Sequence, residues 1–192
     1  MNLKTINIKP IHSLIDFCKI WAPLYPDGKR DKEFYFPALE AKTINEELLL
    51  GFFEWKNGTK LSTLKKASLK NKILKLEVIN DLRDRETVDL KKIRASFPDV
   101  SDIWLITLAH LINPDAFPIF DQHVYRAYKF LELNTVDIYD YDKEYNRLKL
   151  YRSNYLPFFL EIVHDDIIGR KTLDEAFWTF GKFLATYHRI LE

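Results

Sequence analysis

The stretch that decides the fold begins with FPDVSDIWL at residues 97–105 and ends with FPIFDQHVYR at residues 117–126. A proline-containing turn at 97–101 separates two apolar segments of helical spacing, so two short helices meet there. Ser101 or Asp102 can cap the second helix, which is apolar almost all round and therefore buried. Asp121 opens a further helix. The pattern over residues 97–129 thus predicts a helix, a tight turn, a buried helix, a loop and another helix.

The remaining sequence also reads as helices joined by short loops. Asn45 and Thr172 have the chemistry of helix caps, Thr172 with Glu175 three residues later, and Asn57-Gly58 is a helix stop. Residues 25–37 read as an extended loop. The further helices are predicted over residues 11–21, 48–55, 61–82 (one long helix or two shorter ones), 89–97 and 140–164, the last interrupted near Pro157.

The composition favours an all-α protein with a substantial core. The chain has 192 residues, of which 47% are hydrophobic and only 5 are glycine. A chain of this length suits one domain, and so few glycines argue against a many-stranded β fold. We therefore expect residues 1–192 to form a single helical domain, as one bundle or as two helical lobes with a cleft between them.

Charge and cysteine content exclude several classes of function. The formal net charge is +1, so any nucleic-acid binding needs a local basic face. Cys18 is the single cysteine, which excludes an internal disulfide and a four-cysteine iron–sulfur cluster. The histidines have no metal-ligand spacing, and no apolar run approaches the roughly 20 residues of a membrane helix. We expect a cytoplasmic protein with no metal, no cofactor and no membrane partner.

One lysine cluster stands out between residues 60 and 75. A run of this kind is usually a solvated helix face, and the alternative is a stripe that contacts phosphates. Lys65, Lys66 and Lys70 are the candidates for nucleic-acid binding. The six lysines are Lys60, Lys65, Lys66, Lys70, Lys72 and Lys75.

The stretch quoted first resembles the core of the helix-hairpin-helix DNA glycosylases, the endonuclease III-like superfamily. Members of that family have a hairpin of the form LPGVGxKTA, then a buried helix, then VDTHVxR. Here Pro98 stands at the hairpin proline, and Asp121 follows 23 residues later at the head of an Asp-x-His-Val-x-Arg segment that ends at Arg126. The spacing from proline to aspartate is similar to the family's own.

The resemblance implies a base-excision repair hydrolase acting on duplex DNA with a flipped base, or on single-stranded DNA. Asp121 would stabilise the positive charge that develops on the sugar as the N-glycosidic bond breaks. The hairpin's backbone amides, at Val100, Ser101, Asp102 and Ile103, would bind phosphate. The aromatic candidates for the base pocket are Trp104, Phe117, Phe120 and the aromatic residues at 34–36.

Departures from the family pattern leave alternatives open. Ile103 stands where bifunctional members carry a lysine, which predicts no lyase activity by that route. Asp99 and Ser101 replace the hairpin glycines, and Asp99 and Asp102 repel phosphate. The alternatives are a catalytically silent module that binds nucleic acid or a protein partner, and a helical scaffold in which Asp121 only caps a helix. An enzyme requires Asp121 to face a concave, base-sized pocket.

Overall fold

Every regular element of the described residues is a helix, which confirms the predicted all-α class. The computed structural model describes residues 13–26, 28–133, 146–163 and 169–191. Its elements are α1 (Leu14–Trp21), η1 (Ala22–Leu24), α2 (Gly28–Arg30), η2 (Asp31–Tyr35), α3 (Phe36–Glu40), α4 (Glu46–Asn57), α5 (Thr63–Lys72), α6 (Leu76–Arg83), α7 (Leu90–Ser96), α8 (Asp102–Ile112), α9 (Gln122–Leu133), α11 (Arg147–Leu150), η3 (Tyr151–Tyr155), α12 (Leu156–Ile162) and α13 (Arg170–Leu191).

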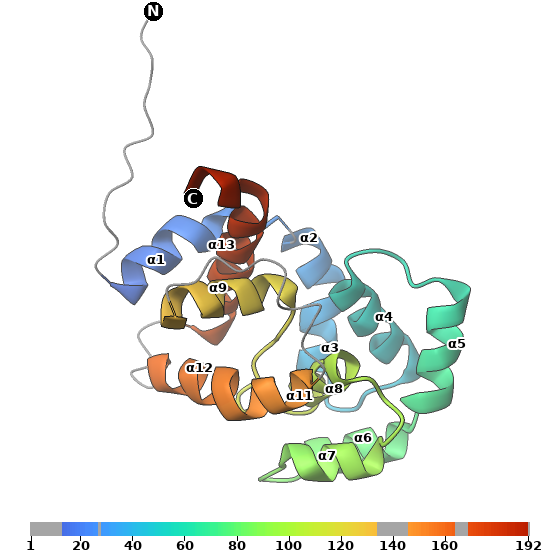
Figure 1. The fold of residues 1–192 in the computed structure, drawn as a ribbon. Coiled ribbons are helices and arrows are strands. Elements are labelled where there is room, and N and C mark those ends of the chain that lie inside the picture. The colour runs from blue at the N-terminus through green and yellow to red at the C-terminus, as the bar shows by residue number, and fades with distance from the viewer. Residues whose placement is uncertain (1–12, 27, 134–145, 164–168, 192) are drawn as a thin grey trace, which may run out of the picture.

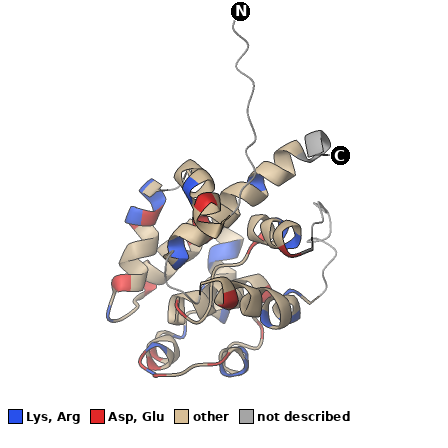
Figure 2. Ribbon diagram, turned by 90° about the vertical axis from the view of Figure 1, so that its left-hand side faces the viewer, with Lys and Arg blue, Asp and Glu red and all other residues tan. Residues whose placement is uncertain are grey.

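The helices gather in two groups (Figure 1). One group contains α1, α9, α11, α12 and α13, so it is built from both ends of the chain, and the other contains α2 to α8. Within the first group α13 packs against α9, α1 and η1. The two groups share one continuous cluster of buried side chains. Acidic and basic residues are interspersed along the helices (Figure 2).

Several helix ends follow the predicted local chemistry. The side chain of Asn45 accepts a 2.9 Å hydrogen bond from the backbone N–H of Leu48 and caps α4, which ends at Gly58 with a φ of 72°. The left-handed backbone at Gly58 costs a glycine nothing, so this stop is set by the sequence. Residues 61–82 form two helices, α5 and α6, which was one of the two predicted alternatives.

Residues 25–37 were predicted to be an extended loop, and that prediction was wrong. They contain α2, the π-helical segment η2 and the start of α3. Pro37 lacks an N–H and its ring crowds the carbonyl four residues earlier, so the preceding turn widens. The Phe36 N–H then bonds to the Asp31 carbonyl, five residues back. Pro157 produces the same widened turn in η3.

The predicted cap at Thr172 was also wrong. Helix α13 begins at Arg170, and the Gly169 carbonyl already accepts a 3.1 Å hydrogen bond from the Leu173 N–H. Thr172 therefore lies inside the first turn. Glu175 pairs with Lys171 at 3.3 Å. In the predicted helix at 140–164, residues 140–145 and 164 lie outside the described residues.

None of the helices in the described ranges is long and apolar enough to cross a membrane.

Gly181 sets how closely α13 approaches α9. A Cβ atom built at this position would overlap the backbone carbonyl of His123, in the first turn of α9. The His123 backbone cannot move aside for a Cβ atom in the way that the end of a flexible side chain can. A glycine at residue 181 is therefore required for α13 to pack beside the segment that begins at Asp121.

We expect Gly181→Ala to destabilise the protein by about 3 kcal/mol or more, because overpacking against backbone forces the two helices apart. The free energy of unfolding, measured with a chemical denaturant, checks this. Gly28→Ala is the control, since a Cβ there meets nothing within 4 Å. Equal stability of the two variants would contradict the close approach of α9 and α13.

Candidate active site

Asp121 combines a helix cap with an ion pair. Its Oδ1 accepts hydrogen bonds from the backbone N–H groups of His123 at 2.8 Å and Val124 at 3.0 Å, at the start of α9. Its Oδ2 lies 2.9 Å from Nζ of Lys56, which α4 contributes. The Lys56 and Asp121 side chains are only 10% and 20% exposed. Burial acts to raise the pKa of the Asp121 carboxyl, but the Lys56 ammonium and the bond from Val124 outweigh it. The pKa lies below its usual value, so the group is ionised at neutral pH.

The aspartate faces a small cavity between the two groups of helices. The cavity measures about 70 Å³. Three of its walls are aromatic, and the Tyr25 and Trp178 rings meet edge-on with centroids 5.3 Å apart. Aromatic walls and polar groups of this kind are typical of sites for flat rings that carry polar atoms, but the volume is smaller than such a ring needs. Its lining residues are Tyr25, Trp55, Lys56, Gly58, Ile119, Asp121, Asp174 and Trp178.

Asp174 is a second carboxyl at the same cavity. It lies on α13 one turn before Trp178, is 8% exposed, and its Oδ1 has no hydrogen-bond partner among the described residues. Burial, aided by the charge of Asp121, raises the pKa of Asp174 to about 7 against the opposing effect of Lys171 and Lys56. The two carboxyls that share this cavity therefore have pKa values shifted in opposite directions.

A buried polar network holds one wall of the cavity. The Trp55 indole N–H donates to Asp31 Oδ1 at 2.5 Å, and Asp31 Oδ2 pairs with Lys171 Nζ at 2.7 Å. The Lys171 ammonium also lies 4.6 Å from the Tyr25 ring centroid and 4.8 Å from that of Tyr35. These contacts fix the Trp55 and Tyr25 rings, and the widened turn of η2 is what turns Asp31 and Tyr35 inward.

A second, larger cavity of about 240 Å³ adjoins the first, and Ile119 and Asp174 line both. Tyr35, His110 and Lys171 also line the larger one. Burial lowers the pKa of His110 to about 3, so its ring is neutral. Its Nδ1 therefore donates to the Phe117 carbonyl at 2.7 Å, and its Nε2 accepts from the Tyr35 hydroxyl at 2.9 Å.

His123 and Arg126, from the same Asp-x-His-Val-x-Arg segment, do not line the cavity but contact a residue that does or each other. The His123 ring packs against Trp178 with centroids 5.0 Å apart. Burial lowers the pKa of His123, and its Nδ1 accepts from the Arg126 guanidinium at 3.2 Å.

The aromatic residues proposed from the sequence for a base pocket do not line the cavity beside Asp121. Trp104 packs against Phe53 with ring centroids 5.3 Å apart. Phe117 and Phe120 are buried in the core, and Phe120 packs against Tyr151 and Tyr155. The helix that carries Trp104 lies deep in the molecule, so these rings serve packing.

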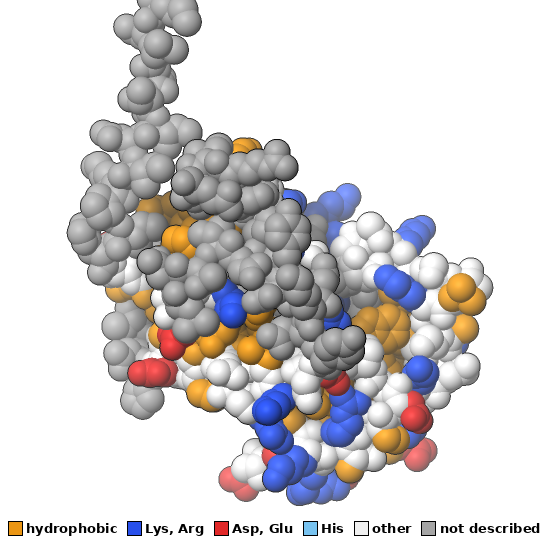
Figure 3. Space-filling model, viewed as in Figure 1, with side chains coloured by type: hydrophobic (Ala, Val, Ile, Leu, Met, Phe, Trp, Pro, Cys, Tyr) orange, Lys and Arg blue, Asp and Glu red, His pale blue; other side chains and the backbone are white. Residues whose placement is uncertain are grey.

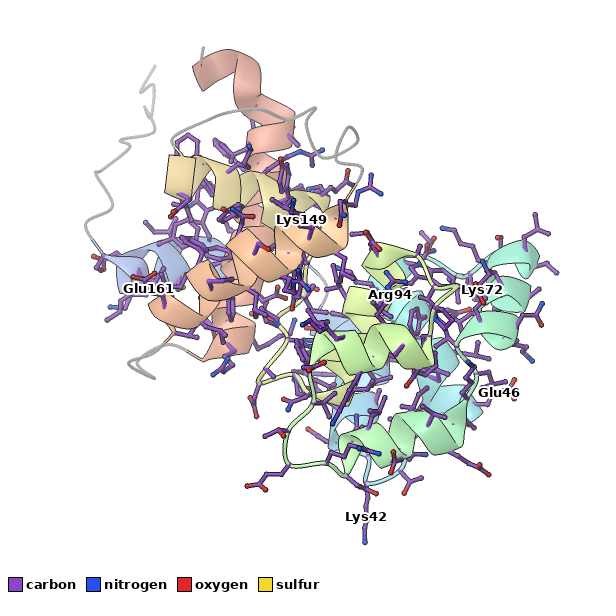
Figure 4. The ribbon with its side chains drawn as sticks, turned by 60° about the horizontal axis from the view of Figure 1, so that its bottom comes forward. Lys42, Glu46, Lys72, Arg94, Lys149 and Glu161 are labelled. Atoms are coloured by element: carbon purple, nitrogen blue, oxygen red, sulfur yellow. The ribbon has the colours of Figure 1, made fainter. Side chains whose placement is uncertain are left out.

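At the predicted hairpin, the Asp102 side chain is engaged by the neighbouring helices. Val100 is buried, whereas Ser101 is exposed and Ile103 half-buried. One Asp102 oxygen pairs with Arg94 at 2.6 Å and the other accepts from the Leu148 N–H at 3.0 Å. Asp102 thereby joins α7, α8 and α11, and Figure 4 shows Arg94 and Lys149 on the neighbouring helices.

The candidate lysines of α5 have partners on or next to α4. Lys66 pairs with Glu54 at 3.0 Å, Lys70 with Glu46 at 2.6 Å, and Lys65 donates to the Asn57 side chain at 2.6 Å. These contacts hold the three lysine side chains against α4, and phosphate binding by this face stays a prediction.

Basic side chains also gather elsewhere, around α7 and α11 at the lower end of the molecule (Figure 3). The exposed lysines on these two helices are Lys91, Lys92 and Lys149.

Sequence reasoning missed most of the residues around Asp121. Lys56 directly precedes the recognised Asn57-Gly58 helix stop, and nothing local marks it as a partner 65 residues from Asp121. Asp174 did leave a signal, since an acidic residue stands between Leu173 and Phe177 on an apolar helix face. Trp178 lies four residues further, on the same face.

Comparisons of the chain with protein-family models, with curated proteins and with solved structures found no match.

Within the part of the chain that the structure describes, no three His, Cys, Asp or Glu side chains come close enough to hold a metal ion. The groups at the cavity are instead suited to acid–base and electrostatic chemistry: an ionised carboxylate, a carboxyl with a raised pKa, and an ammonium group.

We expect Asp174→Asn to raise the free energy of unfolding at pH 8 by up to about 4 kcal/mol relative to wild type, and to change it little at pH 4. Because the folded-state pKa of Asp174 is raised, the native protein holds a proton that the unfolded chain has released. Wild-type stability therefore falls as the pH rises from about 4 to about 7. Denaturant titrations at pH 4, 5, 6, 7 and 8 check this, with exposed Asp99→Asn as the control. A difference between variant and wild type that is independent of pH would contradict the assignment.

Proposed function

We propose that this chain is a monofunctional DNA glycosylase-like hydrolase, which cleaves the N-glycosidic bond of a flipped base with Asp121 as its catalytic carboxylate. The observation that supports the proposal is an ionised, immobilised Asp121 at an aromatic-walled cavity. The resemblance of the 97–126 stretch to the helix-hairpin-helix glycosylases points to the same reaction, and to DNA as the partner.

Asp121 has the properties that electrostatic catalysis requires. As the glycosidic bond breaks, positive charge develops on the sugar, and a fixed carboxylate beside it stabilises the transition state. The two backbone N–H groups at the start of α9 hold the orientation of this carboxylate, and Lys56 keeps it ionised. Water is the nucleophile in this proposal.

Entry of a base requires side chains to move. A cavity of about 70 Å³ is far smaller than the roughly 300–1,000 Å³ of typical ligand pockets. Tyr25 and Trp178 line the cavity, are half-exposed and meet edge-on, and Lys171 holds the Tyr25 ring, so we expect the Trp178 ring to turn when a base enters. The aromatic walls would then stack on the flipped base.

A second function has an observation of its own: a catalytically silent helix-hairpin-helix module that binds nucleic acid or a protein. The carboxylate of Asp102 lies at the first residue of α8, where a hairpin of this kind would bind a phosphate, and Asp99 is exposed beside it. Negative charge there opposes the usual contact with DNA. The exposed lysines of α7 and α11 offer a different basic face.

We expect wild type to release a base from a panel of damaged and modified-base oligonucleotides, and Asp121→Asn to be at least about 100-fold slower. Asparagine caps a helix as well as aspartate does, so this variant keeps the cap while it removes the charge and the ion pair with Lys56; circular dichroism at the assay temperature shows that it is folded. Abasic sites are detected by strand cleavage with alkali.

Glu161→Gln, on the exposed outer face of α12, is the matched control and should keep wild-type rates. If no oligonucleotide loses a base while wild type and Asp121→Asn bind DNA equally, the silent module replaces the enzyme.

A further inference from the structure

The cavity presents two carboxyls in different surroundings. Asp121 is bonded through both oxygens, to two backbone N–H groups and to Lys56. Asp174 is more deeply buried, and its Oδ1 has no hydrogen-bond partner among the residues described. A buried polar atom without a partner is unfavourable unless a ligand or a proton satisfies it.

We propose that Asp174 is the general acid of this site: it donates a proton to the leaving base, while Asp121 stabilises the sugar. The inference rests on the proposed glycosylase function. It also defines a substrate class, because a base that is neutral in DNA leaves as an anion unless it is protonated, whereas a cationic base leaves without help. The site is therefore built to release neutral bases.

The surroundings of Asp174 favour its protonated form. Lys171, on the same helix, is the cation that most opposes this, but it is already paired with Asp31 and Glu175. Burial and the Asp121 charge raise the pKa of Asp174 to about 7, so much of it carries a proton at neutral pH. The charged and titratable groups around it are Lys171, Glu175 and Arg170 on α13, Lys56 on α4, His110 on α8, Asp115, Asp121 ahead of α9, Tyr35 on η2, and Tyr151 and Tyr155 on η3.

The step balances with one water molecule. The bond between the sugar C1′ and the base nitrogen breaks, and its electron pair goes to the base. The Asp174 proton moves to the base, which leaves neutral. Water adds to C1′ and passes its proton to Asp121, which returns it to the solvent, and the solvent reprotonates Asp174. The pairing of a carboxyl with a raised pKa and one with a lowered pKa is the usual basis for such a division of roles.

Two purines of similar size separate this role from a structural one. Hypoxanthine is neutral in DNA and 3-methyladenine is cationic, and both are placed in the same oligonucleotide sequence. In single-turnover reactions we expect Asp174→Asn to slow release of hypoxanthine by about 100-fold and release of 3-methyladenine by less than about 3-fold. Glu161→Gln should change neither rate.

Wild type alone provides the second measurement, which remains decisive if Asp174→Asn does not fold. Its rate on every neutral base that it releases should fall about tenfold per pH unit above a pH of about 7, whereas its rate on a cationic base should not.

Equal slowing of both purines by Asp174→Asn, a flat pH profile on neutral bases, or release of cationic bases only would each overturn the role of Asp174 and leave the glycosylase proposal standing. If no base of either kind is released, the proposed function fails, and the inference fails with it.

Discussion

The ion pair between Lys56 and Asp121 joins the two groups of helices at the point where the candidate chemistry lies. It links α4 to the start of α9 across 65 residues of sequence, and both side chains are largely buried. Removing one partner of a buried pair leaves an uncompensated charge, which typically costs about 3–5 kcal/mol. The pair is therefore both a structural joint and the reason that Asp121 stays ionised.

The aromatic walls of the cavity beside the Lys56–Asp121 ion pair are held by two further sets of contacts. Asp31, Lys171 and Trp55 form a buried chain of contacts that fixes one aromatic wall, and the close packing of α13 on α9 at Gly181 positions the opposite wall. Asp174 lies on the same helix as Gly181, so this packing also brings Asp174 to the cavity, where its Oδ1 has no hydrogen-bond partner among the described residues. The pKa of the Asp121 carboxyl is lowered because Lys56 and backbone N–H groups stabilise its charged form. The pKa of the Asp174 carboxyl is raised because burial removes water from it and its Oδ1 has no hydrogen-bond partner among the described residues.

Local chemistry made much of the secondary structure predictable. Asn45 and Asp121 accept backbone hydrogen bonds at the helix starts that were predicted for them, and α4 ends at Gly58, where a helix stop was predicted. These features depend on neighbours within four residues. The errors fell where proline widened a helical turn, in η2, and where α13 began earlier than its apparent cap.

In the candidate site, too, some features follow from the local sequence and others from tertiary packing. The sequence pattern alone determined the all-α class, because helix periodicity is a property of short segments. The resemblance of the 97–126 stretch to the helix-hairpin-helix glycosylases singled out Asp121 as a candidate. Tertiary structure decided which residues surround that carboxylate. Lys56, Asp174 and Trp178 reach it from α4 and α13, and the aromatic residues nearest to it in sequence, such as Phe120, turn into the core instead. No short-range pattern encodes such contacts, since they follow from how two helical groups pack and not from the propensity of any one segment.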